Sequence, residues 1–363
     1  MPAFTRTGIA NLPLHGGKAP AWLFQRMSKL AREVCIVIVE EFGPEEMLRR
    51  LSDPYWFQAF GCALGFDWHS SGLTTTTCGA LKEGLRGIEN DLGFFVAGGK
   101  GGTSRQTPAE IESCGHLITA DPAELVYASR MVAKVDTAAL QDGYSLYHHT
   151  FVFTRNGHWA VIQQGMNETT RYARRYHWLG EKVTDFVCEP HAAICSEKTG
   201  ACLNLVAEES APARKTIAGI AAEEKPEKTL TEIARIKSLN LPARHYLKVE
   251  DIHPERLGKT LLAAYERAPG GFEELLSLPG VGPKTIRALS LLSELVYGAP
   301  PSFSDPARFS FAHGGKDGIP YPVDRRTYDQ SIELLRKAVG RSRIEGSEKR
   351  RAIARLDGWH SGQ

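Results

Sequence analysis

The heptapeptide Leu-Pro-Gly-Val-Gly-Pro-Lys that ends at Lys284 places two glycines and a lysine between two helix-forming segments. Gly280 and Gly282 let the backbone turn tightly and leave amide hydrogens free for a ligand. Pro283 suits the first position of a helix, where its missing N–H costs nothing. A helix N-terminus offers unpaired amides and partial positive charge, and Lys284 adds a full charge beside them. The sequence therefore predicts that Gly280, Val281, Gly282 and Lys284 hold a phosphate. The alternative is a turn that only closes a helical hairpin.

Residues 272–291 around this loop resemble the helix-hairpin-helix motif of DNA-binding proteins, which holds the DNA backbone without reading bases. The downstream Pro-Val-Asp324 resembles the segment that carries the catalytic aspartate in DNA glycosylases of that superfamily. This resemblance implies that Lys284 attacks the sugar while Asp324 stabilises the developing cation or activates the nucleophile. We also expect the basic residue Arg325 to contact the nucleic acid. From the residues alone, Lys284 could equally pair with phosphate as a point charge, and Asp324 could cap the following helix.

Three further loops combine glycines with a lysine: His-Gly-Gly-Lys18, Gly-Gly-Lys100-Gly-Gly and His-Gly-Gly-Lys316. Adjacent glycines free backbone amides, and the lysine supplies charge. We therefore expect Lys18, Lys100 and Lys316 to contact an extended phosphate backbone. None of the three has the spacing of a nucleotide P-loop, and each alone is more often a flexible turn than a site.

The loop Asp67-Trp-His69-Ser-Ser-Gly gathers a carboxylate, an imidazole and hydroxyl groups in consecutive positions. Such groups serve proton transfer or metal ligation, and a glycine-bounded loop is a usual place for catalytic residues. We therefore expect the catalytic site either at Asp67 and His69 or at Lys284 and Asp324. The alternative for Asp67 and His69 is that they are surface or core residues without a catalytic role. Zinc is only weakly indicated, because the spacing Cys-x2-His-x3-Cys-x6-Cys from Cys188 to Cys202 lacks paired Cys-x2-Cys knuckles.

Residues 171–178 interleave arginines with aromatic side chains. This combination stacks bases and neutralises phosphates in nucleic-acid-binding proteins. A solvated helix face whose apolar side turns inward has the same composition. The sequence leaves both interpretations open.

The elements that must position these groups divide the chain in two. Asp53-Pro54 is a helix start, and Asn156-Gly157 between two alternating β-rich runs predicts an antiparallel hairpin over residues 145–166. From residue 239 onward the chain reads as helices. We expect an α+β protein made of a mixed α/β domain over residues 1–210, a charged helical linker over 211–238, an all-α helix-hairpin-helix domain over 239–340 and a basic tail over 341–363.

The composition is typical of a multidomain soluble protein, with 42% hydrophobic and 24% charged residues in a chain of 363. No segment approaches the ~20 apolar residues of a membrane helix, and the N-terminus lacks the apolar core of a signal peptide. We therefore expect a cytoplasmic protein with no membrane partner. Seven scattered cysteines indicate reduced thiols, and a net charge of +2 leaves local charge to decide about polyanions.

Four longer phrases occur in order: LPLHGGKAPAWLFQRM, GFDWHSSGLTTTTCGALKEGL, VFTRNGHWAVIQQGMN and FAHGGKDGIPYPVDRRTYD. They resemble the prokaryotic family called domain of unknown function 763, and the resemblance extends from residue 1 to about residue 340. It implies no mechanism, but it does imply that the N-terminal domain and the hairpin domain work as one unit.

The sequence as a whole predicts a DNA-binding, DNA-processing enzyme of the repair type. Two reactions fit: a nuclease, which would use a divalent metal ion, and a glycosylase or lyase, which would extrude a base. The alternative from another class is a non-catalytic DNA-structure-binding or adaptor protein. RNA is an alternative ligand, because a phosphate grip does not distinguish the sugar.

Overall fold

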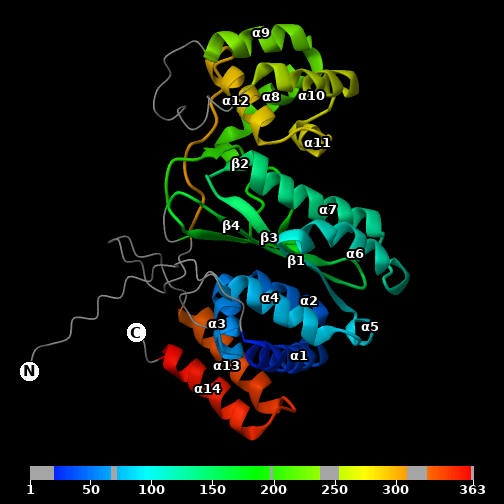
Figure 1. Ribbon diagram of the computed structural model, residues 1–363, viewed down its shortest axis with the longest axis vertical. Helices are drawn as coiled ribbons and strands as arrows, with labels where there is room; N and C mark the ends of the chain where they lie inside the picture. Colours follow the sequence, from blue (N-terminus) through cyan, green and yellow to red (C-terminus); the bar gives the residue numbers. More distant parts are fainter. Residues whose placement is uncertain (1–19, 67–71, 197–198, 238–252, 309–324, 361–363) are drawn as a thin grey trace, which may run out of the picture.

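The chain folds into layers, in which one antiparallel sheet separates two groups of helices (Figure 1). The computed structural model describes residues 20–66, 72–196, 199–237, 253–308 and 325–360. The combination of a sheet with helices on both faces confirms the mixed helix-and-sheet class that the sequence predicts. In this part of the chain no helix is both long and apolar enough to cross a bilayer.

The central sheet has the strand order β1-β3-β4-β5-β6, and every neighbouring pair is antiparallel. Its strands are β1 (Phe94–Lys100), β3 (Ser145–Thr154), β4 (Trp159–Met166), β5 (Ala173–Leu179) and β6 (Ala193–Ser196), while β2 (Leu140–Gln141) pairs with β7 (Leu203–Asn204). The hairpin predicted around Asn156-Gly157 is confirmed as β3 and β4. Side chains alternate between the faces, so Phe151 and Phe153 enter one core while Val152 enters the other.

The lower face of the sheet in Figure 1 packs on helices from both ends of the chain. These are α1 (Ala21–Phe42), α2 (Pro44–Ser52), α3 (Pro54–Leu64), α4 (Gly72–Leu85), α13 (Arg325–Arg341) and α14 (Gly346–His360), with the short α5 (Glu89–Leu92) at the edge. The helix start predicted at Asp53 is confirmed, because its carboxylate accepts hydrogen bonds from the amides of Tyr55 (2.8 Å) and Trp56 (3.0 Å). Leu335 of α13 lies in the same core as Met27 of α1.

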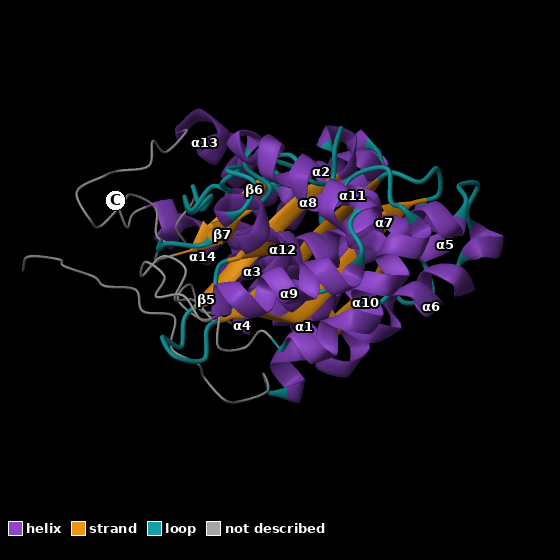
Figure 2. Cartoon of the chain, turned by 90° about the horizontal axis from the view of Figure 1, so that it is seen from above, coloured by secondary structure: helices purple, strands orange, loops and turns teal. Residues whose placement is uncertain are grey.

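The upper face of the sheet is covered first by α6 (Thr107–Ser113) and α7 (Pro122–Lys134), and then by the helices at the top of Figure 1. Those helices are α8 (Ala211–Glu223), α9 (Pro226–Lys237), α10 (Pro254–Arg267), α11 (Phe272–Ser277) and α12 (Pro283–Leu295). Seen from above, they lie over the strands (Figure 2). A short helix, η1 (Gly101–Gln106), follows β1, and a π-helical turn, η3 (Val135–Ala139), extends α7.

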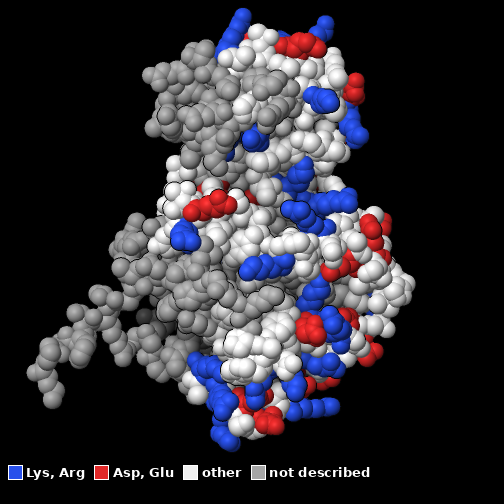
Figure 3. Space-filling model, viewed as in Figure 1, with Lys and Arg blue, Asp and Glu red and all other residues white. Residues whose placement is uncertain are grey.

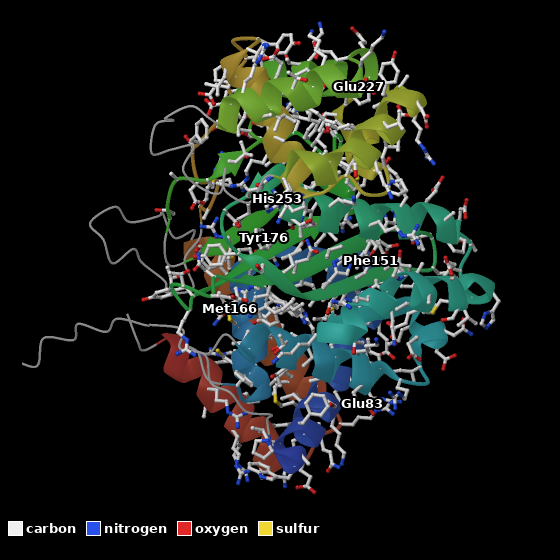
Figure 4. The ribbon with its side chains drawn as sticks, turned by 45° about the horizontal axis from the view of Figure 1, so that its top comes forward. Glu83, Phe151, Met166, Tyr176, Glu227 and His253 are labelled. Atoms are coloured by element: carbon white, nitrogen blue, oxygen red, sulfur yellow. The ribbon has the colours of Figure 1, made fainter. Side chains whose placement is uncertain are left out.

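The layers do not follow chain order, since α12 belongs to the upper core and α13 to the lower core. Figure 4 shows Phe151 and Tyr176 on the sheet, between the layer that carries Glu83 and the layer that carries Glu227. The expected division into domains at 1–210 and 239–340, with a linker at 211–238 and a tail at 341–363, stays a prediction about which parts can fold alone. Helices do occupy residues 211–237, as the sequence predicts.

The basic and aromatic cluster at 171–178 is the clearest correction. It is neither a base-stacking surface nor a solvated helix face, because Ala173–Leu179 form β5, which is buried throughout. Arg174, Arg175, Tyr176 and Trp178 are each at most 2% exposed. The strand lies between β4 and β6 and is covered on both faces, which removes these side chains from contact with any large ligand.

Candidate functional site

The loop between α11 and α12 is a tight turn held by its own apolar residue. Gly280 takes a φ of +85°, a conformation that side-chain-bearing residues rarely adopt. Val281 is 1% exposed and belongs to the upper core, and its amide donates to the carbonyl of Leu278 at 3.3 Å. Gly282 then stands at the N-cap of α12 in extended conformation. The buried valine therefore fixes how the two glycines on either side of it face solvent.

The outward side of this turn presents donors. The first hydrogen bond of α12 runs from the amide of Ile286 to the carbonyl of Gly282 at 3.0 Å. Within the described part of the chain, the amides of Gly282, Lys284 and Thr285 have no acceptor. Gly280 and Lys284 are exposed. Free amides and an ammonium group thus lie together at the positive end of a helix dipole.

The inward side of the turn presents carbonyls, and these are already occupied. Lys134 of α7 donates through Nζ to the carbonyl of Leu278 at 3.4 Å and, more closely, to that of Val281. Gln141 donates to the carbonyl of Pro283 at 2.9 Å and accepts from Arg287 of α12. Partial burial lowers the pKa of Lys134. The layer beneath therefore holds the turn by its acceptors and leaves its donors outward.

A cavity of about 810 Å³ lies beside this turn, between α7, the β3–β4 hairpin and η1. Its polar and charged lining comes from Ser104, Arg105, Glu112, Ser129, Arg130, Lys134, Thr137, Tyr147, His148, His149 and Gln163, and Ser277 at the end of α11 closes one side. Apolar side chains such as Val126, Met131 and Leu146 form much of the remainder. Lys134 connects the two features, because it lines the cavity and also contacts the turn between α11 and α12.

A chain of buried hydrogen bonds opens on this cavity. Ser129 Oγ lies 2.9 Å from His149 Nε2, and His149 Nδ1 lies 2.7 Å from Gln163 Oε1. The Gln163 amide nitrogen donates to Asp136 Oδ2 at 2.5 Å. Because Oε1 can only accept, the proton of a neutral His149 sits on Nδ1, and Nε2 is left to accept from the Ser129 hydroxyl. Burial is the main cause that lowers the pKa of His149, which keeps the ring neutral.

The carboxylate at the end of this chain is fully buried. Asp136 also accepts from Trp178 Nε1 at 2.9 Å and lies 2.5 Å from His191 Nε2. His191 lines a second, smaller cavity of about 230 Å³ next to Asn204 and Arg308. A buried carboxylate is stable only when such donors surround it, so Asp136 fixes the orientation of Gln163 and, through it, of His149.

The lower face of the sheet carries a separate polar cluster. Arg175 donates to His177 Nε2 at 2.8 Å, to Gln58 of α3 at 3.1 Å and to Thr74 of α4 at 3.3 Å. His148, which also lines the larger cavity, is 1% exposed, its Nδ1 has no hydrogen-bond partner among the described residues, and burial lowers its pKa to about 3. The two helices that reach Arg175, α3 and α4, are those that flank residues 67–71.

Some of the sequence-predicted residues lie in the described part of the chain and others lie outside it. The structure brings Gly280, Val281, Gly282 and Lys284 together at the hairpin turn and places Lys100 elsewhere, exposed at the end of β1 and 5.9 Å from the ring of Tyr147. The predictions on Lys18, Asp67, His69, Lys316 and Asp324 lie outside the described residues. Arg325 begins α13, in the lower layer, and its side chain also lies outside them.

Sequence reasoning did not single out Ser129, Lys134, His149 or Gln163 as site residues. Among the described residues, no three His, Cys, Asp or Glu side chains meet as a metal site, and the weakly indicated set from Cys188 to Cys202 is not one. The seven cysteines are free thiols, most of them buried.

The chain belongs to the family described as a protein of unknown function, DUF763, whose family model matches residues 8–323. The resemblance noted in the sequence is thereby confirmed at the level of the family. Comparison with curated proteins and with solved structures gave no match.

Proposed function

We propose that this member of the DUF763 family binds DNA through the turn at Gly280–Lys284 and works as a DNA-processing protein. One observation carries the proposal: among the described residues the amides of Gly282 and Lys284 have no acceptor, at a turn where Lys284 is exposed, while carbonyls of the same turn accept hydrogen bonds from Lys134. A phosphate oxygen is the acceptor that suits such amides at a helix N-terminus. The resemblance of residues 272–291 to helix-hairpin-helix motifs supports the same ligand.

The charge of the neighbouring surface supports a polyanion. Figure 3 shows Lys and Arg side chains over the part of this face where α6 and α7 lie, with acidic side chains mostly toward its edge. The described basic residues there include Arg105 of η1 and Arg130 of α7, both exposed. Such a surface adds counterion release to the contacts of the turn itself.

The position of Lys284 favours a phosphate contact over nucleophilic attack. Nucleophilic lysines are usually desolvated in apolar pockets, whereas Lys284 is exposed on the first turn of α12. This argues against the lysine glycosylase reaction. A nuclease and a non-catalytic DNA-structure-binding protein both remain compatible with the turn, and its phosphate grip alone does not separate DNA from RNA.

The test is Lys284→Glu, measured by fluorescence anisotropy of labelled duplex DNA over a range of salt concentrations. We expect affinity to fall roughly three- to tenfold for every DNA sequence, and the slope of log affinity against log salt to fall by about 1, since one phosphate contact is lost. Lys29→Glu makes the same charge change at an exposed position of α1, in the lower layer, and should leave both the affinity and the salt slope unchanged. Identical affinity and slope for wild type and Lys284→Glu would refute the proposal. The same anisotropy titration with duplex RNA compares the affinities for DNA and RNA.

A further inference from the structure

Ser129 and His149 have no part in the proposed DNA contact at Gly280–Lys284. Both side chains line the cavity beside that turn. We propose that Ser129 is a nucleophile and His149 its general base, and that the cavity hydrolyses phosphate esters. The choice of phosphate esters as substrates rests on the proposed DNA function, whereas the pairing of nucleophile and base rests on the geometry alone.

The hydrogen bonds orient the pair for proton transfer. Gln163 is held by Asp136 and, at 3.4 Å, by the carbonyl of Val132, so its oxygen faces His149 Nδ1. Nε2 of that ring is then the free base, and it lies 2.9 Å from Ser129 Oγ. A serine, an imidazole and a third group that fixes the imidazole are the parts that activate a serine nucleophile. Here an amide fixed by a carboxylate takes the third place.

The cavity supplies the charges that a phosphate ester needs. Arg105, Arg130 and Lys134 line it, and Glu112 is the acidic side chain in the same lining. Cationic donors aimed at phosphate oxygens stabilise the charge that builds up during transfer. The rest of the lining includes Val126 and Met131, which can pack on the apolar part of a nucleotide.

The cavity is also placed where DNA held by the turn would come close. Lys134 lines the cavity and binds two carbonyls of the turn, and Ser277, which ends α11 just before it, lines the cavity as well. The two sites therefore share a wall. A strand that crosses the turn can present a neighbouring phosphate to the cavity.

The proposed reaction balances with water as the second substrate. Ser129 Oγ attacks phosphorus while its proton passes to His149 Nε2. The ester P–O bond breaks, and the leaving oxygen takes that proton. A water molecule then gives a proton to Nε2 and attacks the phosphoserine. Ser129 Oγ leaves with that proton, so one ester and one water become one alcohol and one phosphate group.

The experiment uses a fluorophosphonate probe on the full chain, which forms a covalent bond to an activated serine and releases fluoride. Peptide mass spectrometry should place the adduct on Ser129 of the wild type. Labelling should vanish in Ser129→Ala, slow at least tenfold in His149→Gln and persist in Ser104→Ala, which alters another serine of the same cavity. Thermal unfolding checks that each variant folds.

Mapping on the wild type needs no variant, so it decides the matter even where a variant fails to fold. Folded wild type that gives no adduct, an adduct on a different serine, or a rate that a folded His149→Gln leaves unchanged would each overturn the proposal. The probe needs no DNA, so labelling is measured in its absence. A failure here therefore leaves the DNA-binding proposal standing, and the reverse also holds.

Discussion

Two basic segments of this protein, the turn before α12 and the strand β5, place their charge in opposite environments. Lys284 is exposed, beside amides that have no acceptor among the residues that the structure describes. Arg174 of β5 is 1% exposed and forms ion pairs with Asp142 at 2.9 Å and Asp305 at 2.6 Å. The charge of Lys284 is available to a ligand, whereas the charge of Arg174 is neutralised by carboxylates inside the fold. The comparison shows that a cationic residue is a binding candidate only where the fold leaves it in water.

The reason lies in how the two elements are covered. β5 is an interior strand, so its side chains alternate between two closed faces: Arg174 points to the upper layer and Arg175 to the lower layer, over the ring of Phe57 at 4.7 Å. The α12 turn has one closed side, filled by Val281, and one open side. An element covered on one side, such as the α12 turn, is anchored and still reaches solvent. An element covered on both sides, such as β5, is buried.

The largest expected effect is on folding. Arg174→Met should lower the free energy of unfolding by about 3–5 kcal/mol, because it leaves the carboxylates of Asp142 and Asp305 buried without their cation. Urea denaturation measures this loss. Arg171→Met, at an exposed position three residues earlier, should change stability by less than about 0.5 kcal/mol. If Arg174→Met lowered the free energy of unfolding as little as Arg171→Met, Arg174 would not have the structural role that distinguishes β5 from the turn.

A smaller effect on folding, coupled to binding, is expected at the turn. Gly280→Ala should cost about 1–2 kcal/mol, since φ is +85° there and the new Cβ would lie 3.1 Å from Thr260 Oγ1. Gly298→Ala is its control, with a φ of +67° and open space just after the other end of α12. Both variants should lose stability in urea titrations, but only Gly280→Ala should weaken DNA binding. Equal loss of binding in both would mean that general destabilisation, not the turn, controls affinity.

Local sequence signals predicted much of the fold. Asp53 caps a helix through its own carboxylate, and Asn156-Gly157 sets a hairpin whose register places His149 opposite Gln163. The turn around Val281 was also predictable from the sequence. Its signals are a glycine that adopts positive φ, a proline at N1 and a lysine, and these act within a few neighbouring residues. Each of these features is decided within a few residues.

What the sequence could not reveal depends on contacts between distant segments. Ser129 meets His149 only because α7 packs across the sheet, and Lys134 reaches Val281 over a separation of 147 residues. The cluster at 171–178 was misread because its arginines interrupt the apolar run that usually marks an interior strand. The carboxylate partners of Arg174, Asp142 and Asp305, lie far away in the chain and give no local signal.

The most direct test of the central claim follows the amides themselves. In protein labelled with ¹⁵N-glycine, the amide signals of Gly280 and Gly282 should shift or broaden on titration with duplex DNA, while that of Gly298 at the other end of α12 stays unchanged. Unmoved signals from Gly280 and Gly282 at saturating DNA would contradict the account, because the phosphate would then be bound elsewhere.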